Sequence, residues 1–237
     1  MDSEGLHTSH LEYDFDSRSI MIVELSGIRH DEVVLQLGLI MGFFNFNVTG
    51  NMNQPIRSFG AGRHGAGNEP DMTLKHRLDT SMGADEGPFV LEVGDSQSMG
   101  SLQRKANMWL ARDYVRLVVI ISIIEYIDGN VGLLFLAYDK HSSVRNGNHF
   151  LPTLAKSFGV SLHSNTIAAI TRHTGLNSDQ ILYSRIDNCN APNKPEYFYE
   201  VPQHIFYQGV PGWNVRNDDV PPFVIDLFLF RSAALGP

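Results

Sequence analysis

Cysteine is almost absent from this chain of 237 residues, because Cys189 is its only one. An intrachain disulfide and a zinc site built from several cysteines are therefore excluded, and we expect an intracellular protein of the cytoplasm or nucleus. Long apolar runs are also missing, since the longest, residues 117–124, is far too short to span a bilayer. Residues 1–4 lack the apolar segment of a secretory signal. We expect no membrane partner.

Basic residues are scarce. The chain has 18 Lys and Arg against 26 Asp and Glu, a formal net charge of −8. Tight, non-specific binding to nucleic acid is disfavoured, because neutralising phosphates requires clustered Lys and Arg. Transient contact with nucleic acid through a local basic patch stays open. Histidines are more frequent, but they lack ligand spacing and no HExxH is present, so we assign no zinc site.

The apolar pattern predicts an α/β fold in which a mixed sheet is flanked by helices. Residues 89–93, 98–112 and 115–124 read as strand, helix and strand. The apolar and β-branched run 115–124 indicates a strand covered on both faces. From Asp31, apolar residues recur at helical spacing. The remaining predictions are a hairpin at 11–16 and 19–25, strands at 56–59, 71–74, 131–138 and 223–230, helices at 152–158 and 164–172, and loops at 45–55 and 188–195.

We divide the chain into three parts. Residues 1–10 are a polar tail, and residues 11–138 are the α/β core. Residues 139–237 are a C-terminal extension that packs on this core and returns a late strand at 223–230. No internal repeat is evident.

Glu92 is a carboxylate within an apolar strand, "FVLEV". A buried carboxylate must be paired, protonated or bound to a cation. Asp71 lies upstream in "EPD", at the start of another expected strand, so both carboxylates can converge if the two strands pair. Two such oxygen donors suit Mg²⁺ or Mn²⁺, which could activate water for attack on a phosphodiester.

The order of "EPD", the strand "VLEVGDSQS" and the helix "MGSLQRKANMWL" resembles the PD-(D/E)XK restriction-endonuclease-like superfamily. Within it, the segment is similar to Uma2-type endonuclease-like proteins and to a group of fungal proteins of that kind. The resemblance covers roughly residues 11–137 and implies a nuclease-like core. It assigns metal binding to Asp71 and Glu92, with Glu32 as an auxiliary ligand. Homodimers are common in this superfamily, but no interface can be identified here.

The chain departs from the motif at Gly94, where the resemblance requires a lysine that stabilises charge on the phosphate. Lys105 in the following helix is our first substitute. At 100° per residue it lies about 60° from the buried residue Leu102, whereas Arg104 faces solvent. Gln97 is the second substitute, near the strand end but uncharged.

Each of these residues also has a structural interpretation. Glu92 and Lys105 could form a plain salt bridge, and Asp71 alone could be a turn or strand-end residue. Glu32 could be a helix-start acid that interacts with the helix dipole. Ser96 and Ser98 read as helix caps.

Two functions follow. One is a metal-dependent nuclease that hydrolyses phosphodiesters, with Asp71, Glu92, Lys105 and Gln97 at its catalytic centre. The other is an inactive relative that keeps the fold and acts in binding or protein interaction. An open approach to both carboxylates favours the nuclease, whereas a pair plugged by Trp109 favours the inactive module.

Overall fold

A computed structural model of the chain describes the fold at residues 9–14, 19–24, 28–47, 56–59, 70–76, 86–95, 97–147, 149–181, 189–208, 210 and 223–235. Within these ranges, the side chains of residues 9–24, 40–47, 56–59 and 76 lie outside the description. No helix of the described residues is both long and apolar enough to cross a membrane.

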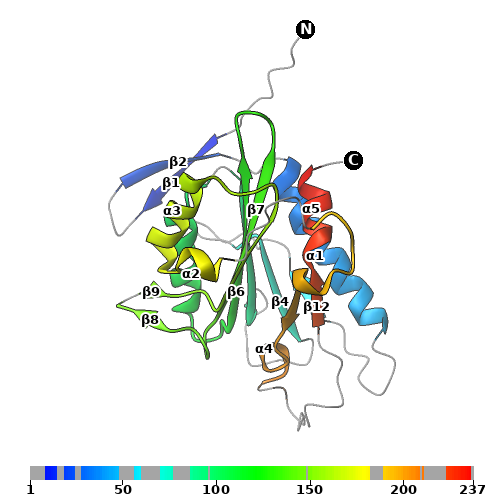
Figure 1. The fold of residues 1–237 in the computed structure, drawn as a ribbon. Helices are drawn as coiled ribbons and strands as arrows, with labels where there is room; N and C mark the ends of the chain where they lie inside the picture. The colour runs from blue at the N-terminus through cyan, green and yellow to red at the C-terminus, as the bar shows by residue number, and fades with distance from the viewer. Residues whose placement is uncertain are drawn as a thin grey trace.

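A six-stranded mixed sheet forms the centre of the molecule, in the order β10-β7-β6-β5-β4-β3 (Figure 1). Strands β5 and β6 are parallel, and all other neighbours are antiparallel. This confirms the α/β class and the mixed sheet. The strands are β3 (Ile56–Phe59), β4 (Met72–His76), β5 (Phe89–Asp95), β6 (Leu117–Glu125), β7 (Val131–Asp139) and β10 (Leu154–Gly159).

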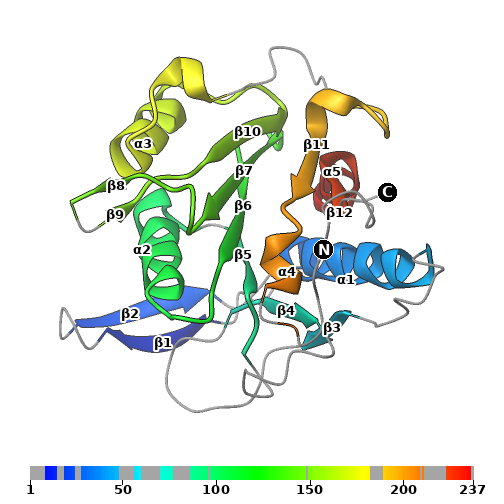
Figure 2. The ribbon, with the colours of Figure 1, turned by 90° about the horizontal axis from the view of Figure 1, so that it is seen from below.

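Helices cover both faces of the sheet. In Figure 2, α2 (Met99–Leu110) and α3 (Ser164–Thr174) lie on one side, and α1 (Ile28–Asn47) and α5 (Leu227–Leu235) on the other. Each side has its own buried apolar cluster, with Leu102 of α2 in one and Val33 of α1 in the other. The central strands are therefore apolar on both faces, as the run 115–124 predicts.

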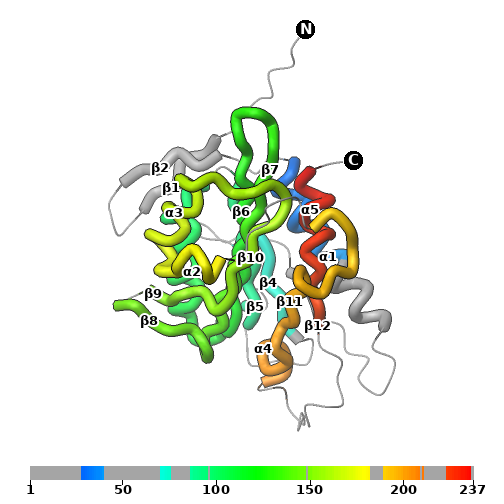
Figure 3. The backbone as a smooth tube through the Cα atoms, in the orientation of Figure 1, coloured from blue at the N-terminus to red at the C-terminus, as the bar shows by residue number. Residues whose placement is uncertain are grey.

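The chain also forms smaller elements, and Figure 3 shows those that follow β7 beside this core. The smaller elements are the hairpin β1 (Ser9–Asp14) and β2 (Ser19–Glu24), the hairpin β8 (Arg145–Asn146) and β9 (His149–Phe150), the pair β11 (Phe198–Val201) and β12 (Phe223–Asp226), the short helix α4 (His204–Tyr207), and the 3₁₀ turns η1 (Ser178–Gln180) and η2 (Pro195–Tyr197).

Several boundaries differ from the prediction. Ser9 and His10 belong to β1, so the polar tail does not extend to residue 10. Helix α1 begins at Ile28, three residues before Asp31, and continues to Asn47 in the stretch expected to be loop. Val33 and Leu37 are buried as its periodicity requires, whereas the side chains of Ile40, Met41 and Phe44 lie outside the described residues.

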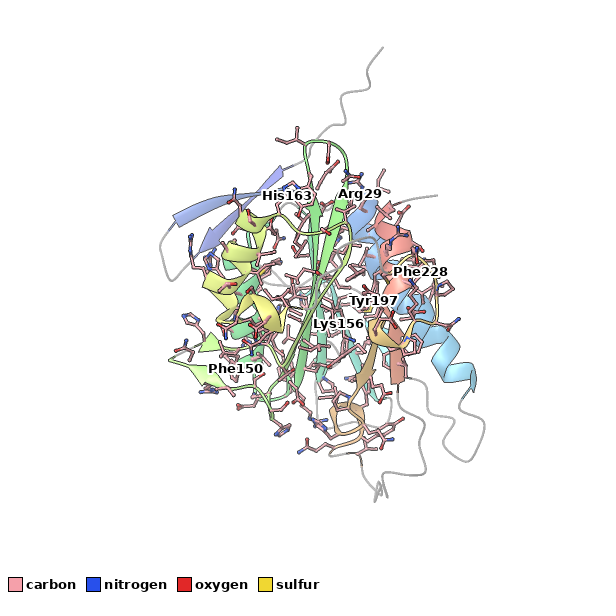
Figure 4. The ribbon with its side chains drawn as sticks, in the orientation of Figure 1. Arg29, Phe150, Lys156, His163, Tyr197 and Phe228 are labelled. Carbon is pink, nitrogen blue, oxygen red and sulfur yellow. The ribbon has the colours of Figure 1, made fainter. Side chains whose placement is uncertain are left out.

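The helix predicted at 152–158 is wrong. This segment forms β10, which pairs with β7 at the edge of the sheet and so extends the sheet past residue 138. The buried Lys156 donates from Nζ to the Phe198 carbonyl oxygen at 2.7 Å and ties β10 to β11 (Figure 4). These partners are distant in sequence, so local propensity could not reveal them.

The strand predicted at 223–230 is correct only up to Asp226. It pairs with β11 and not with the central sheet, and α5 begins at Leu227. Asp226 explains the change, because its Oδ1 accepts the Phe228 backbone N–H at 3.0 Å, as a helix-capping carboxylate does.

Candidate functional site

Strand β5 presents alternate residues to the two faces of the sheet, because side chains alternate along a strand. Leu91 and Val93 join the apolar cluster beneath α1, whereas Val90 joins the cluster beneath α2. Glu92 follows the second set and contacts α2. The strand therefore directs a carboxylate into an apolar layer.

Both carboxylate oxygens of Glu92 accept hydrogen bonds from α2. Lys105 Nζ donates to Oε2 at 2.8 Å, and Trp109 Nε1 donates to Oε1 at 2.6 Å. The side chain of Glu92 is 0% exposed, and that of Lys105 is 24% exposed. Burial raises the pKa of Glu92 to about 7, while the charge and hydrogen bond of Lys105 and the hydrogen bond of Trp109 lower it and the charge of Asp71 raises it.

Asp71 comes immediately before β4, whose register pairs Met72 with Leu91. Asp71 is a bend at the end of this ladder, and its carboxylate contacts the Val93 backbone and α1, on the side of the sheet opposite to α2. Asp71 Oδ2 accepts the Val93 backbone N–H at 2.6 Å. Its Oδ1 lies 3.1 Å from His30 Nε2.

His30 of α1 is a contact of Asp71 that the residue-by-residue prediction did not assign. Its Nδ1 also lies 3.0 Å from Asp31 Oδ1, and its side chain is 13% exposed. Burial alone would lower the pKa of His30, but the hydrogen bonds and charges of Asp71 and Asp31 raise it overall. Spacing could have found this residue, since His30 precedes the buried Val33 and Leu37 by three and seven positions. The prediction placed His30 at the start of the helix but counted the helical period from Asp31 and gave His30 no role at the site.

The other predicted site residues lie apart from this group. Glu32 is partly buried in α1 and has no hydrogen bond or ion pair with the described residues. The buried Oε1 of Gln97 has no hydrogen-bond partner in the described part of the chain, and neither residue is joined to Glu92. Arg104 is exposed and Ser98 caps α2, accepting the Ser101 N–H at 3.2 Å, as predicted. Ser96 lies outside the described residues.

Gly94 is explained by packing. A Cβ atom placed there would lie 2.7 Å from Leu102 Cδ1 and 2.8 Å from Cδ2, and Leu102 is fully buried. Helix α2 thus packs against the backbone at the position where the motif requires lysine. Lys105, one turn further along this helix, donates to Glu92 from its ammonium group.

We call His30, Asp71, Glu92, Lys105 and Trp109 the Glu92 centre. Among the described residues, no group of three or more His, Cys, Asp and Glu side chains could hold a metal ion. Mg²⁺ can use one or two carboxylates, but it keeps several of its waters and needs an open approach. Glu92 offers no solvent-facing surface for such a hydrated ion. The residues as arranged therefore do not fit a bound Mg²⁺ or Mn²⁺.

No known protein family matches the chain, and no curated protein matches it either.

Proposed function

We propose that this chain is a binding module in which the Asp71–Glu92 pair is a structural cross-link and not a hydrolytic centre. The observation that carries the proposal is that both carboxylate oxygens of Glu92 already accept a hydrogen bond from the chain itself. This carboxylate is fully buried, and Lys105 and Trp109 each donate to one of its oxygens. A Glu92 carboxylate that is closed off by Trp109 is the arrangement we expect of an inactive relative, because a nuclease needs an open approach to this carboxylate.

The bonds of Asp71 support the same function. One oxygen accepts the Val93 N–H and the other faces His30, so this carboxylate joins β5 to α1. Glu92 joins β5 to α2 on the other face. The two acids therefore connect the sheet to both helix layers. A buried charge is tolerated in a fold when it has a charged or hydrogen-bonding partner. Removing that partner leaves the charge uncompensated and strongly destabilises the folded state.

A metal-dependent nuclease is the second candidate. The observation that favours it is that Lys105 contacts Glu92 and that the charge of Asp71 is near enough to raise the pKa of Glu92. These are the three residues for which the PD-(D/E)XK resemblance implies catalytic roles. In that function Lys105 would stabilise charge on the phosphate, and His30 would hold Asp71 in position. Glu92 would first have to lose at least one of its two donors.

Cleavage and metal binding test the two candidates together. Wild type, Asp71→Asn, Glu92→Gln and the control Glu200→Gln are compared on DNA and RNA with Mg²⁺ or Mn²⁺, and metal uptake is followed by calorimetry. Glu200 is an exposed acid on β11, so its substitution controls for the loss of one charge. We expect no cleavage and no metal uptake by any of the four proteins. Cleavage by wild type and Glu200→Gln that both site variants lose would overturn the proposal in favour of the nuclease.

A further inference from the structure

A cleft of about 560 Å³ opens where β6 begins and β7 ends. Its lining includes Arg116, Lys140, His141, Ser143, Arg145 and Phe150. It shares no residue with the Glu92 centre. In Figure 4, Phe150 marks the β8–β9 side of this region, at the edge of the sheet far from the β6–β7 turn. The volume is in the range of sites that hold small organic ligands.

The charge of this cleft is opposite to that of the whole chain. Arg116, Lys140 and Arg145 line it with only Asp113 as a carboxylate, whereas the chain carries a net charge of −8. Like charges that share a concave surface repel one another, and a bound anion relieves that repulsion. Burial lowers the pKa of Lys140, Asp113 raises it, and the charge of Arg145 lowers it. The two cations are therefore close enough for the charge of Arg145 to lower the pKa of Lys140.

Arg145 is held in place without using its hydrogen-bond donors. Its guanidinium carbon lies 4.3 Å from the centroid of the Phe150 ring, a cation–π stack. Its backbone pairs with Phe150 between β8 and β9, and among the described residues its guanidinium group has no hydrogen-bond or ion-pair partner. This cation–π contact leaves the N–H groups of the guanidinium available, which suits a two-pronged contact with a phosphate.

The wall that carries these groups is fixed by hydrogen bonds. Asp139 Oδ1 accepts the His141 N–H at 2.9 Å, and the Asp139 carbonyl accepts the Ser143 N–H at 2.7 Å. The Ser143 hydroxyl oxygen is shielded from solvent and has no partner in the described part of the chain. Lys140 donates one N–H to the Arg112 carbonyl at 2.8 Å, and its ammonium group has two more donors. The cleft is thus a preformed set of donors.

We propose that this basic cleft binds a small phosphate-bearing ligand. Arg145 would bind the phosphate through its N–H groups, with the Lys140 ammonium group as a further donor. A small ligand fits better than a nucleic-acid backbone, because one concavity that also contains Asp113 is not the extended basic stripe that a polymer of phosphates needs. The inference goes beyond the proposed function and does not depend on whether the Glu92 centre is catalytic.

Calorimetry without divalent cations tests the cleft, with inorganic pyrophosphate and ADP as probes. We expect wild type to bind at least one of them, and Arg145→Gln to weaken binding by about tenfold or more, the change expected when a charge-assisted double contact is lost. Arg145→Lys keeps the charge but loses the planar fork, so we expect an intermediate loss. Arg104→Gln, on the exposed face of α2, removes the same charge elsewhere and should leave affinity within about twofold.

Lys140→Gln tests the second donor and leaves the contact between Arg145 and Phe150 in place. We expect it to weaken binding by about tenfold, the effect of losing one charge-assisted hydrogen bond. Equal affinity for pyrophosphate and ADP would mean that the cleft recognises the phosphates alone. Tighter binding of ADP would mean that the cleft also contacts the nucleoside. Three results would overturn the proposal: no binding of either probe by wild type, equal losses in Arg104→Gln and Arg145→Gln, or tighter binding of a short oligonucleotide than of ADP.

Discussion

The Glu92 centre and the basic cleft differ in whether their charged groups have hydrogen-bond partners within the chain. At the Glu92 centre, the buried carboxylate receives two donors from its own chain, one at each oxygen. In the cleft, the stacked guanidinium group of Arg145 lies near Lys140 without an acceptor in the described part of the chain. Charges that the fold itself satisfies contribute to stability, whereas charges left close together and unsatisfied are available to a ligand. This difference leads us to look for binding at the cleft and for structural effects at Glu92.

Removing the buried carboxylate should have the largest effect on stability. We expect Glu92→Ala to lower the free energy of unfolding by about 3–5 kcal/mol, because it breaks a buried ion pair and leaves the Trp109 N–H without its acceptor. Urea denaturation measures the change. Glu200→Ala, at an exposed position of β11, should stay within about 0.5 kcal/mol of wild type. Unchanged or increased stability of Glu92→Ala would instead be the behaviour of a functional residue held at a cost to the fold.

Gly94 sharpens the comparison, because it tests whether packing excludes the motif lysine. We expect Gly94→Ala to destabilise the protein by about 1–3 kcal/mol, since even a methyl group would press on the buried Leu102. The matched control is Gly38→Ala in α1, where the added Cβ would meet Met72 Cε at an ordinary 3.7 Å. That variant should be neutral or up to about 1 kcal/mol more stable, because alanine favours the helix. Equal melting temperatures of the two variants would remove the packing explanation for the missing lysine.

Much of this architecture could be predicted from local patterns. The apolar and β-branched composition of 89–93 and 115–124 correctly indicated β5 and β6. Helical periodicity correctly placed Lys105 beside the buried face and Arg104 in solvent. Segments whose structure depends on distant partners were not predictable in this way. Strand β10 is defined by pairing with β7, and Asp226 ends a strand by capping a helix.

The two sites differ in the same respect. Asp71 immediately precedes β4 and Glu92 lies on β5, so the pairing of these two strands could be expected from their closeness in sequence. The hydrogen bond of Trp109 depends on how α2 sits over Gly94, which no spacing rule specifies. The basic cleft combines the start of β6 with the segment after β7, and its cations are scattered singly along the sequence. The net charge of −8 did not indicate this cleft, because the total charge of a chain says nothing about how its charged residues group in space.

The pH dependence of stability provides the finest test of the Glu92 centre. The pKa of Glu92 is about 7 in the folded protein, above the ordinary value of 4.5. Between these values the folded state binds the proton more readily than the unfolded state, so stability falls as pH rises from about 4.5 to about 7. His30 acts in the same direction, because its raised pKa contributes stability below 6.5 that is lost as pH rises through its folded-state pKa. Any change at Glu92 should therefore alter this decline.

Trp109→Phe should produce the smallest change and the most specific one. It keeps an aromatic ring but removes the N–H donor, so we expect a loss of about 1 kcal/mol and a further rise in the pKa of Glu92, which this hydrogen bond lowers. Melting curves from pH 4 to 9 should then show the decline extending to higher pH. Tyr138→Phe is the matched control, because it removes one buried bond, from Tyr138 Oη to Gln103 Oε1 of α2 at 2.7 Å, without touching a charge. Tyr138→Phe should lower the free energy of unfolding by a similar amount at every pH. A parallel loss in both variants would mean that Trp109 contributes only packing, and Glu92 would then hold its charge through Lys105 alone.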